Sequence, residues 1–178
     1  EEAREPNLRQ IYDYAGRTDS PDRRPIIAIP GTLGSRLLDK GSNTVIWGGR
    51  GGLSIDPEHP ENQRLLALPI GKGDEPLSEL HDNVRTSGVL RVARPTVLGL
   101  EFEQDIYRGA VETLIAGGYD FRRTRREEIE EREFNLDSFE FPYDWRRDIV
   151  EAARELDDFV TRKTAQVTEA RRKAFGPN

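Results

Sequence analysis

The feature that most restricts the fold is a short apolar run, residues 26–29 (IIAI), which ends abruptly at Pro30-Gly31. Because no polar residue interrupts the run, it is typical of a strand covered on both faces in a parallel sheet. A second glycine, Gly34, follows in the loop, and such a loop presents free backbone N–H groups beyond the strand. Open α/β sheets bind their ligands at this edge. A loop in this position, at residues 30–35, can hold an anion or a developing oxyanion.

Two helices and one more strand are expected further along the chain. Apolar residues recur every four positions from Phe102 to Leu114 and predict a helix that the glycine pair at 117–118 terminates. Residues 134–141 predict a second strand, with a bulge or bend at 137–138.

The most regular segment is residues 149–174, which predict a long amphipathic helix. One helical face carries the apolar residues Ile149, Ala153, Leu156, Val160, Val167 and Ala170 or Ala174. Asp144 or Asp148 can cap the start of this helix, and Gly176-Pro177 stops it. The resulting order of strand, helix, strand and helix predicts an α/β fold.

The remaining segments are polar or irregular. Residues 1–24 are polar and predict an arm that lies outside the core. Glycines and prolines crowd residues 41–99, which therefore predict an irregular excursion of the kind that forms lids and binding loops. The charge run at 122–132 predicts a solvated surface segment. Residues 25–178 are thus expected to form one partial α/β domain with this excursion.

Composition limits both the core and the chemistry. Of the 178 residues, 35% are hydrophobic and 34% are charged, so the core is small or shared. The chain has no cysteine and only two histidines, so we expect no disulfide, no metal site and no cofactor. The formal charge of -6 argues against a nucleic-acid-binding surface. No apolar run approaches the ~18 residues of a membrane-spanning helix, and we expect a soluble or peripheral protein of unassigned compartment.

Three interpretations of the loop at residues 30–35 stay open on spacing alone. A Pro-Gly pair most often marks an ordinary turn after a strand. A phosphate-binding loop needs a lysine after Gly34 or the glycine spacing of a dinucleotide site, and the sequence has neither. The third interpretation is an oxyanion hole for acyl transfer, in which a backbone N–H after the strand acts with one from a nucleophile elbow.

Two separated signatures resemble one enzyme family. Residues 25–37 (PIIAIPGTLGSRL) are similar to the opening strand and oxyanion loop of the lecithin:cholesterol acyltransferase family of α/β-hydrolases. This family includes lysosomal phospholipase A2 and the phospholipid:diacylglycerol acyltransferases. Residues 141–146 (FPYDWR) resemble the same family's P-Y-D-W-R signature, and the resemblance covers most of residues 25–160. Between the two signatures, the family's order is kept by Trp47, Gly88-Val89 and Gly118-Tyr119.

The resemblance implies a serine hydrolase or acyltransferase that acts on lipid acyl esters. The backbone N–H of Thr32 is then one oxyanion donor, and Gly31 and Leu33 shape the approach to it. Trp47 is a candidate substrate contact, although a single tryptophan is more often packed in a core. The apolar run at 65–70 is a second candidate lipid contact, and a run of this length is more often simply buried.

The second signature is expected to support the site without direct chemistry. At the end of a strand, Asp144 can cap backbone N–H groups and Trp145 can fill the crevice below. Arg146 can pair with a carboxylate.

The sequence departs from the family at the nucleophile. No Gly-x-Ser-x-Gly motif is present; residues 52–56 (GLSID) come nearest, and we interpret Ser54 as a loop serine. In the family the elbow follows one strand after the long helix, and the acid and histidine come later. We therefore expect the nucleophile, the acid, the histidine and a second oxyanion donor beyond Asn178. His59 and His81 are expected to be exposed loop residues.

These expectations combine into one function and two alternatives. The chain is expected to be the oxyanion-loop and lid portion of a serine lipase or acyltransferase, the amino-terminal half of an α/β-hydrolase sheet, inactive by itself. Its expected partners are a lipid acyl ester, a membrane surface and the carboxyl-terminal half. The first alternative is a non-catalytic module that binds lipid or protein through the glycine-rich excursion. The second, a nucleotide-binding protein, requires affinity for phosphates at residues 31–35.

Half of a doubly wound sheet leaves a strand edge and the apolar face of the 149–174 helix uncovered. We therefore predict that the isolated chain is unstable or oligomeric at micromolar concentration. Sedimentation velocity combined with a thermal scan checks this prediction. A cooperative thermal transition from a monomer would contradict it.

Overall fold

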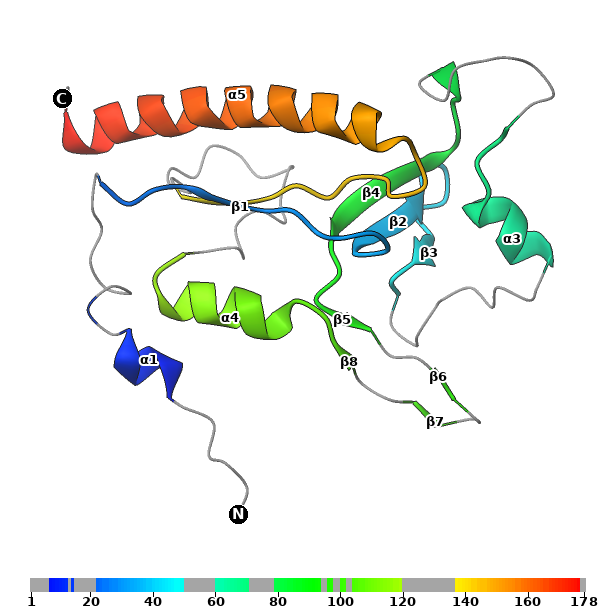
Figure 1. Cartoon of the computed structure of the whole chain (residues 1–178), viewed down its shortest axis with the longest axis horizontal. Coiled ribbons are helices and arrows are strands. Elements are labelled where there is room, and N and C mark those ends of the chain that lie inside the picture. Colours follow the sequence, from blue (N-terminus) through cyan, green and yellow to red (C-terminus); the bar gives the residue numbers. More distant parts are fainter. Residues whose placement is uncertain are drawn as a thin grey trace.

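The computed structural model describes residues 7–12, 14, 22–49, 60–70, 79–93, 96–97, 100–101, 104–119 and 137–176, and all structural statements concern these residues. Helices and strands are mixed, and the strands form small sheets, in agreement with the α/β class (Figure 1). Several sequence predictions lie outside the described residues: the charge run at 122–132, the first part of the 134–141 strand, Ser54 and His59.

A parallel pair of strands joins the two signature segments. β1 (Ile26–Ala28) pairs with β9 (Ser138–Glu140), with Ile26 opposite Ser138 and Ala28 opposite Glu140. This pairing confirms the strand predicted at 26–29 and the strand predicted within 134–141. Because the strands are parallel, both of their carboxyl ends open at the same edge, and the loops that follow them meet there.

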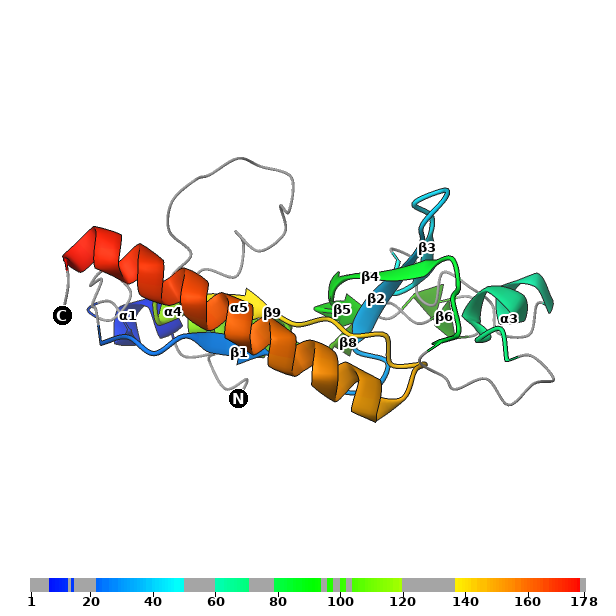
Figure 2. The same ribbon diagram turned by 90° about the horizontal axis from the view of Figure 1, so that it is seen from above.

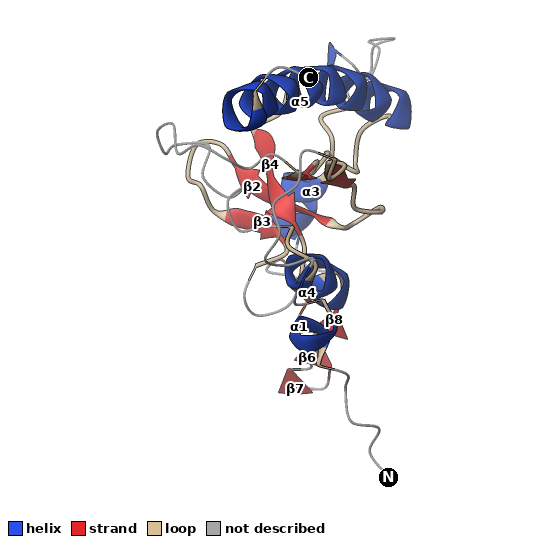
Figure 3. Ribbon diagram, turned by 90° about the vertical axis from the view of Figure 1, so that its left-hand side faces the viewer, coloured by secondary structure: helices blue, strands red, loops and turns tan. Residues whose placement is uncertain are grey.

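Helices lie on both sides of this pair. α5 (Ile149–Phe175) lies on one side and α4 (Arg108–Ala116) on the other, as the two side views agree (Figures 1 and 3). On the α5 side, the ring of Phe159 packs against Phe139 and Phe141, with ring centroids 6.4 and 5.2 Å apart. Seen from above, α5 lies over β1 and β9 (Figure 2).

α4 is bound to both ends of β1. Before the strand, the Tyr119 hydroxyl donates to the carbonyl oxygen of Arg24 at 3.2 Å. After the strand, the backbone N–H of Gly31 donates to the hydroxyl of Tyr107 at 2.8 Å. The helix therefore runs antiparallel to β1 and fixes the loop that follows it.

β1 is less covered than its apolar sequence predicted. Its three residues are half-buried, and the next residue, Ile29, is 50% exposed. Within the described residues this sheet has two strands, so β1 has a strand neighbour on one edge and not on the other. The prediction of full coverage on both faces is therefore wrong for β1 in this structure.

A three-stranded antiparallel sheet follows the binding loop. Its order is β3-β2-β4, formed by β3 (Val45–Trp47), β2 (Ser35–Asp39) and β4 (Val84–Val89). The core lies in this sheet, where Leu37, Ile46 and Val84 are buried together. The sequence did not predict β2. Within 41–99 it predicted an irregular excursion with short elements, and the six-residue strand β4, paired with β2, corrects that prediction. The missing information is non-local, because β2 is stabilised by partners on both sides that no local pattern reveals.

The remaining elements are short. Two-residue strands pair as β5 (Val92–Ala93) with β8 (Gln104–Asp105), and as β6 (Thr96–Val97) with β7 (Leu100–Glu101). The chain also forms the helices α1 (Leu8–Ile11) and α3 (Pro60–Leu66).

α4 begins later than the sequence predicted. The four-residue periodicity predicted a helix from Phe102, but residues 104–105 pair with β5 and the helix starts at Arg108. Its predicted end at the glycine pair is confirmed, because the N–H of Gly117 donates to the carbonyl oxygen of Thr113 at 3.1 Å.

α5 confirms the predicted long helix. The Asp148 carboxylate accepts the backbone N–H of Val150 at 2.9 Å and caps the first turn, and the N–H of Gly176 donates to the carbonyl oxygen of Arg172 at the other end. Within the described residues, α5 and the other helices lack the combination of length and apolarity needed to cross a membrane.

The buried face of α5 differs in part from the predicted one. Ala152 and Val167 are buried, and Phe159 packs on β9, whereas Ile149 is 67% exposed and Val160 is 40% exposed. The sequence prediction omitted Ala152 and Phe159 and followed apolar residues on the adjacent, exposed side of the helix.

The cap of α5 generates a stability prediction. Replacing Asp148 by Ala removes the acceptor for the Val150 N–H, and we expect a loss of about 1 kcal/mol in the free energy of unfolding. Urea denaturation followed by circular dichroism measures this loss. Asp158→Ala is the control, since Asp158 is exposed within the helix and carries no cap. An equal effect of the two substitutions would show that the cap does not stabilise α5.

Candidate functional site

The loop after β1 folds into a tight turn. The N–H of Gly34 donates to the carbonyl oxygen of Gly31 at 2.9 Å, which places Thr32 and Leu33 at the two central positions. Leu33 has a φ of 67°, the positive value that a type II turn requires at its second central position. A bulky side chain is rare in this conformation, which is strained for residues with a Cβ atom.

Glycine is required at position 34. A Cβ atom there would lie 2.8 Å from the Cβ of Pro30 and 2.9 Å from the carbonyl oxygen of Gly31, closer than real Cβ atoms approach. The tight approach of the chain to itself therefore excludes any larger residue without a shift of the loop.

Trp47 holds the strained residue in place. Its indole Nε1–H donates to the carbonyl oxygen of Leu33 at 2.8 Å. The indole also packs edge-on against Trp145, with ring centroids 5.2 Å apart, and lies half-buried against the core cluster. The structure thus places Trp47, a predicted substrate contact, in packing and in the hydrogen bonding of the loop.

Among the described residues, the turn leaves two backbone donors without a partner, the amides of Thr32 and Leu33. Thr32 is exposed. The amide of Gly31, by contrast, is bound to the Tyr107 hydroxyl. Exposed apolar side chains flank Thr32 in the sequence, since Ile29 is 50% and Leu33 is 45% exposed. The site is therefore an unpaired N–H group beside apolar surface.

Ser35 brings the second signature to this loop. Its side chain is fully buried, and its hydroxyl oxygen accepts the backbone N–H of Tyr143 at 3.1 Å. Its carbonyl oxygen accepts the indole N–H of Trp145 at 3.3 Å. Ser35 and Tyr143 are 108 residues apart in the sequence. The two segments that carry the family resemblance are thus in direct contact.

Arg146 is the centre of a buried ionic cluster. Its side chain is 4% exposed, and its Nε and Nη2 atoms donate to the two carboxylate oxygens of Asp144 at 2.9 and 2.6 Å. Nη2 also binds Asp82, and Nη1 donates to the carbonyl oxygens of Leu65 and Leu66 at 3.4 and 3.3 Å. The cluster ties the end of α3 and the segment before β4 to the second signature.

The charges in this cluster support one another. Burial lowers the pKa of Arg146, but the hydrogen bonds and negative charges of Asp144 and Asp82 outweigh it, so the pKa lies above its ordinary value. Asp144 also accepts the backbone N–H of Arg146 at 3.1 Å, while the cap of α5 itself is Asp148.

The sequence did not identify a second buried acid at the end of β9. Glu140 is 8% exposed, and its Oε1 atom accepts Nη2 of Arg91 at 2.8 Å while Oε2 accepts the N–H of Val89 at 3.3 Å. Ser138 and Glu140 alternate with phenylalanines, which normally indicates a solvent-exposed polar face. Here all three residues of β9 are buried, and Glu140 has its partners on other elements.

The other predicted contacts lie outside this site. His81 is exposed, as expected for a loop residue. The run at 65–70 was a candidate lipid contact, with burial as the alternative. Leu66 packs on the core cluster, whereas Leu65 is 44% and Ile70 is 72% exposed, and the lipid contact stays a prediction. Across the part of the chain that the structure describes, no group of three or more acidic, histidine or cysteine side chains is placed to hold a metal ion.

Comparisons with known proteins found no relative of this chain. No protein-family model matches the chain, and no curated protein or solved structure is significantly similar to it. The resemblance of residues 25–37 and 141–146 to the lecithin:cholesterol acyltransferases therefore stays a prediction.

The Arg146 cluster generates a second stability prediction. Arg146→Ala leaves the carboxylates of Asp82 and Asp144, each 13% exposed, without their cation. We expect a loss of about 3–5 kcal/mol in the free energy of unfolding, measured by urea denaturation. Arg172→Ala is the matched control, because Arg172 binds Glu169 through two similar bonds but its side chain is 64% exposed. No measurable loss is expected there, and a comparable loss would contradict the role assigned to burial.

Proposed function

We propose that this chain is the oxyanion-loop and lid portion of a serine lipase or acyltransferase that acts on lipid acyl esters. The nucleophile, in this proposal, lies beyond residue 178. The observation that carries the proposal is the unpaired Thr32 amide, which lies at the carboxyl end of β1.

The chemistry requires a donor of this kind. When a serine hydroxyl attacks an ester, the carbonyl oxygen gains negative charge in the tetrahedral intermediate, and an N–H group about 2.7–3.1 Å away stabilises that charge. The donor acts best when it is fixed before the reaction, and the Gly31–Gly34 hydrogen bond and the Trp47 indole fix the turn that carries Thr32. Because a backbone group donates, the Thr32 side chain is not required.

The surroundings of Thr32 favour an apolar substrate. Ile29 and Leu33, close to the donor in the sequence, expose large aliphatic side chains. The turn itself does not require a leucine at position 33. A carbonyl group bound at the Thr32 amide would leave its attached acyl chain beside these side chains. This arrangement fits an acyl ester better than inorganic phosphate or a nucleotide.

The finer fold assignment is part of the same proposal. A parallel pair with helices on both sides is the repeating unit of a doubly wound sheet. We infer that further strands extend the β1-β9 pair into an α/β-hydrolase sheet. Because α4 and α5 lie on opposite sides of the pair, a right-handed connection places the next strand after α5 at the open edge of β1, on the side away from β9. The carboxyl-terminal half, a lipid acyl ester and a membrane surface are the proposed partners, and residues 41–99 are the proposed lid.

A non-catalytic binding module on the same scaffold is the second candidate, favoured by the absence of a Gly-x-Ser-x-Gly motif from the 178 residues. The coding sequence downstream of Asn178 separates the two. The enzyme requires an apolar strand followed by Gly-x-Ser-x-Gly or Ala-x-Ser-x-Gly within about 20 residues. Its absence would favour the module.

The donor role of Thr32 can be tested in the chain itself. Proline is favoured at the first central position of this turn, and Gly31 has no Cβ atom to clash with it. Thr32→Pro therefore removes the N–H while the turn is retained, and Thr32→Ala retains both. Hexylphosphonate, an anion with an apolar tail, is titrated while backbone amide signals are followed by NMR. We expect binding by the wild type and Thr32→Ala, and at least tenfold weaker binding by Thr32→Pro.

Inorganic phosphate is the control ligand for this titration. Equal affinity for phosphate and hexylphosphonate would favour a phosphate-binding loop, and equal binding by Thr32→Pro and the wild type would remove the oxyanion role of Thr32.

A further inference from the structure

A tyrosine hydroxyl binds Gly31, the residue that precedes the free Thr32 amide. The Tyr107 oxygen accepts the Gly31 N–H at 2.8 Å, and it would lie 3.4 Å from a Cβ atom on Gly31. The Cε2 atom of the same ring would lie 3.0 Å from a Cβ atom on Gly34. The half-buried Tyr107 ring therefore lies along the turn, from its first residue to its last.

The proton of this hydroxyl is available to a ligand. A phenol has one O–H to donate, and the oxygen here already serves as acceptor for Gly31. Among the residues that the structure describes, Tyr107 has no acceptor for that proton. The Gly31 and Thr32 amides are consecutive along the backbone, so the hydroxyl binds the N–H group one residue before the unpaired one. Accepting a hydrogen bond also polarises the phenol and strengthens it as a donor.

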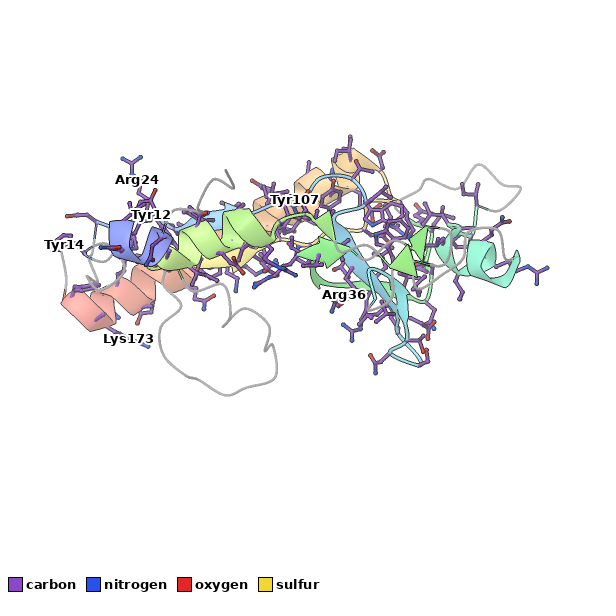
Figure 4. All side chains as sticks on the ribbon, turned by 90° about the horizontal axis from the view of Figure 1, so that it is seen from below. Tyr12, Tyr14, Arg24, Arg36, Tyr107 and Lys173 are labelled. Carbon is purple, nitrogen blue, oxygen red and sulfur yellow. The ribbon has the colours of Figure 1, made fainter. Side chains whose placement is uncertain are left out.

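The backbone of Tyr107 is bound to Arg91, whose side chain is bound to Glu140 of β9. The carbonyl oxygen of Arg91 accepts three backbone N–H groups at the start of α4, those of Ile106, Tyr107 and Arg108, at 3.1, 3.1 and 3.2 Å. The guanidinium of Arg91 is bound in turn by the buried Glu140. Figure 4 shows Tyr107 where α4 begins. The strand that pairs with β1 thus also fixes the hydroxyl over the loop that follows β1.

We propose that Tyr107 is a second donor of the oxyanion site. Its hydroxyl oxygen accepts the Gly31 N–H. Its O–H donates to the same substrate carbonyl oxygen as the Thr32 N–H. This inference rests on the proposed function, and it adds a side-chain donor that the family resemblance does not imply. The tyrosine keeps its proton throughout, because it stabilises the developing charge by a hydrogen bond and transfers nothing.

The hexylphosphonate titration tests this inference with variants of Tyr107. Tyr107→Phe keeps the ring against Gly34 and removes the O–H, and we expect about tenfold to a hundredfold weaker binding. Tyr119→Phe is the matched control, because its hydroxyl donates to Arg24 at the other end of α4. It is expected to bind like the wild type. A retained amide spectrum in each variant shows that the fold is intact.

Replacing Tyr107 by 3-fluorotyrosine separates a donor from a positioning residue. Fluorine makes the phenol a stronger donor and a weaker acceptor, and both proteins are titrated at pH 6. A donor to the anion predicts tighter binding than the wild type. A residue that only holds the Gly31 N–H predicts weaker binding, which would overturn the inference.

The outcomes for the two proposals are distinct. If the wild type and Thr32→Ala bind, Thr32→Pro does not, and Tyr107→Phe binds like the wild type, the Tyr107 inference fails and the proposed function stands. If the wild type does not bind hexylphosphonate, the oxyanion site fails and the Tyr107 donor fails with it.

Discussion

Ser35 occupies the point at which the two sheets and the two signature loops meet. Its hydroxyl accepts a backbone N–H from Tyr143, its carbonyl accepts the Trp145 indole, and it lies opposite Val89 in the antiparallel sheet. A buried hydroxyl without a partner costs about 1–3 kcal/mol, so this serine strongly favours one arrangement of the surrounding segments. The packing of Trp47 on Trp145 and the pairing of Arg146 with Asp82 both follow from that arrangement.

Local pattern predicted the elements that carry a strong signal in their own sequence. The IIAI run of β1 and the long helix α5 carry strong periodic or apolar signals, and the cap and stop residues of α5 are close to it in sequence. β2 and β4 were missed because their hydrogen bonds come from each other and from β3. The start of α4 was misplaced for the same reason, since the pairing of residues 104–105 with β5 overrode a helical periodicity.

The residues of the site divide in the same way, into those that a local sequence pattern identifies and those that it does not. Gly31, Thr32 and Leu33 could be identified from a strand that ends in Pro-Gly, because the turn is a property of consecutive residues. Tyr107 could not, because it reaches Gly31 across 76 residues of sequence. Glu140 likewise gives no local signal of its contact with Arg91, 49 residues away. Residues that shape a site from a distance are positioned by the fold, and the fold has to be known before they can be found.

The strain at Leu33 connects stability with the site. A leucine at φ 67° costs about 1–3 kcal/mol relative to a relaxed backbone, and the side chain recovers little of this by burial because it is 45% exposed. The conformation persists because the Trp47 indole binds the Leu33 carbonyl and the Gly34 amide closes the turn. The same contacts hold the turn that carries the free Thr32 amide. A relaxed loop at this position would let the backbone rotate, and the donor would lose the fixed direction on which electrostatic stabilisation of an oxyanion depends. The proposed function would explain this strained leucine as part of the site, since its half-exposed side chain contributes little to the core.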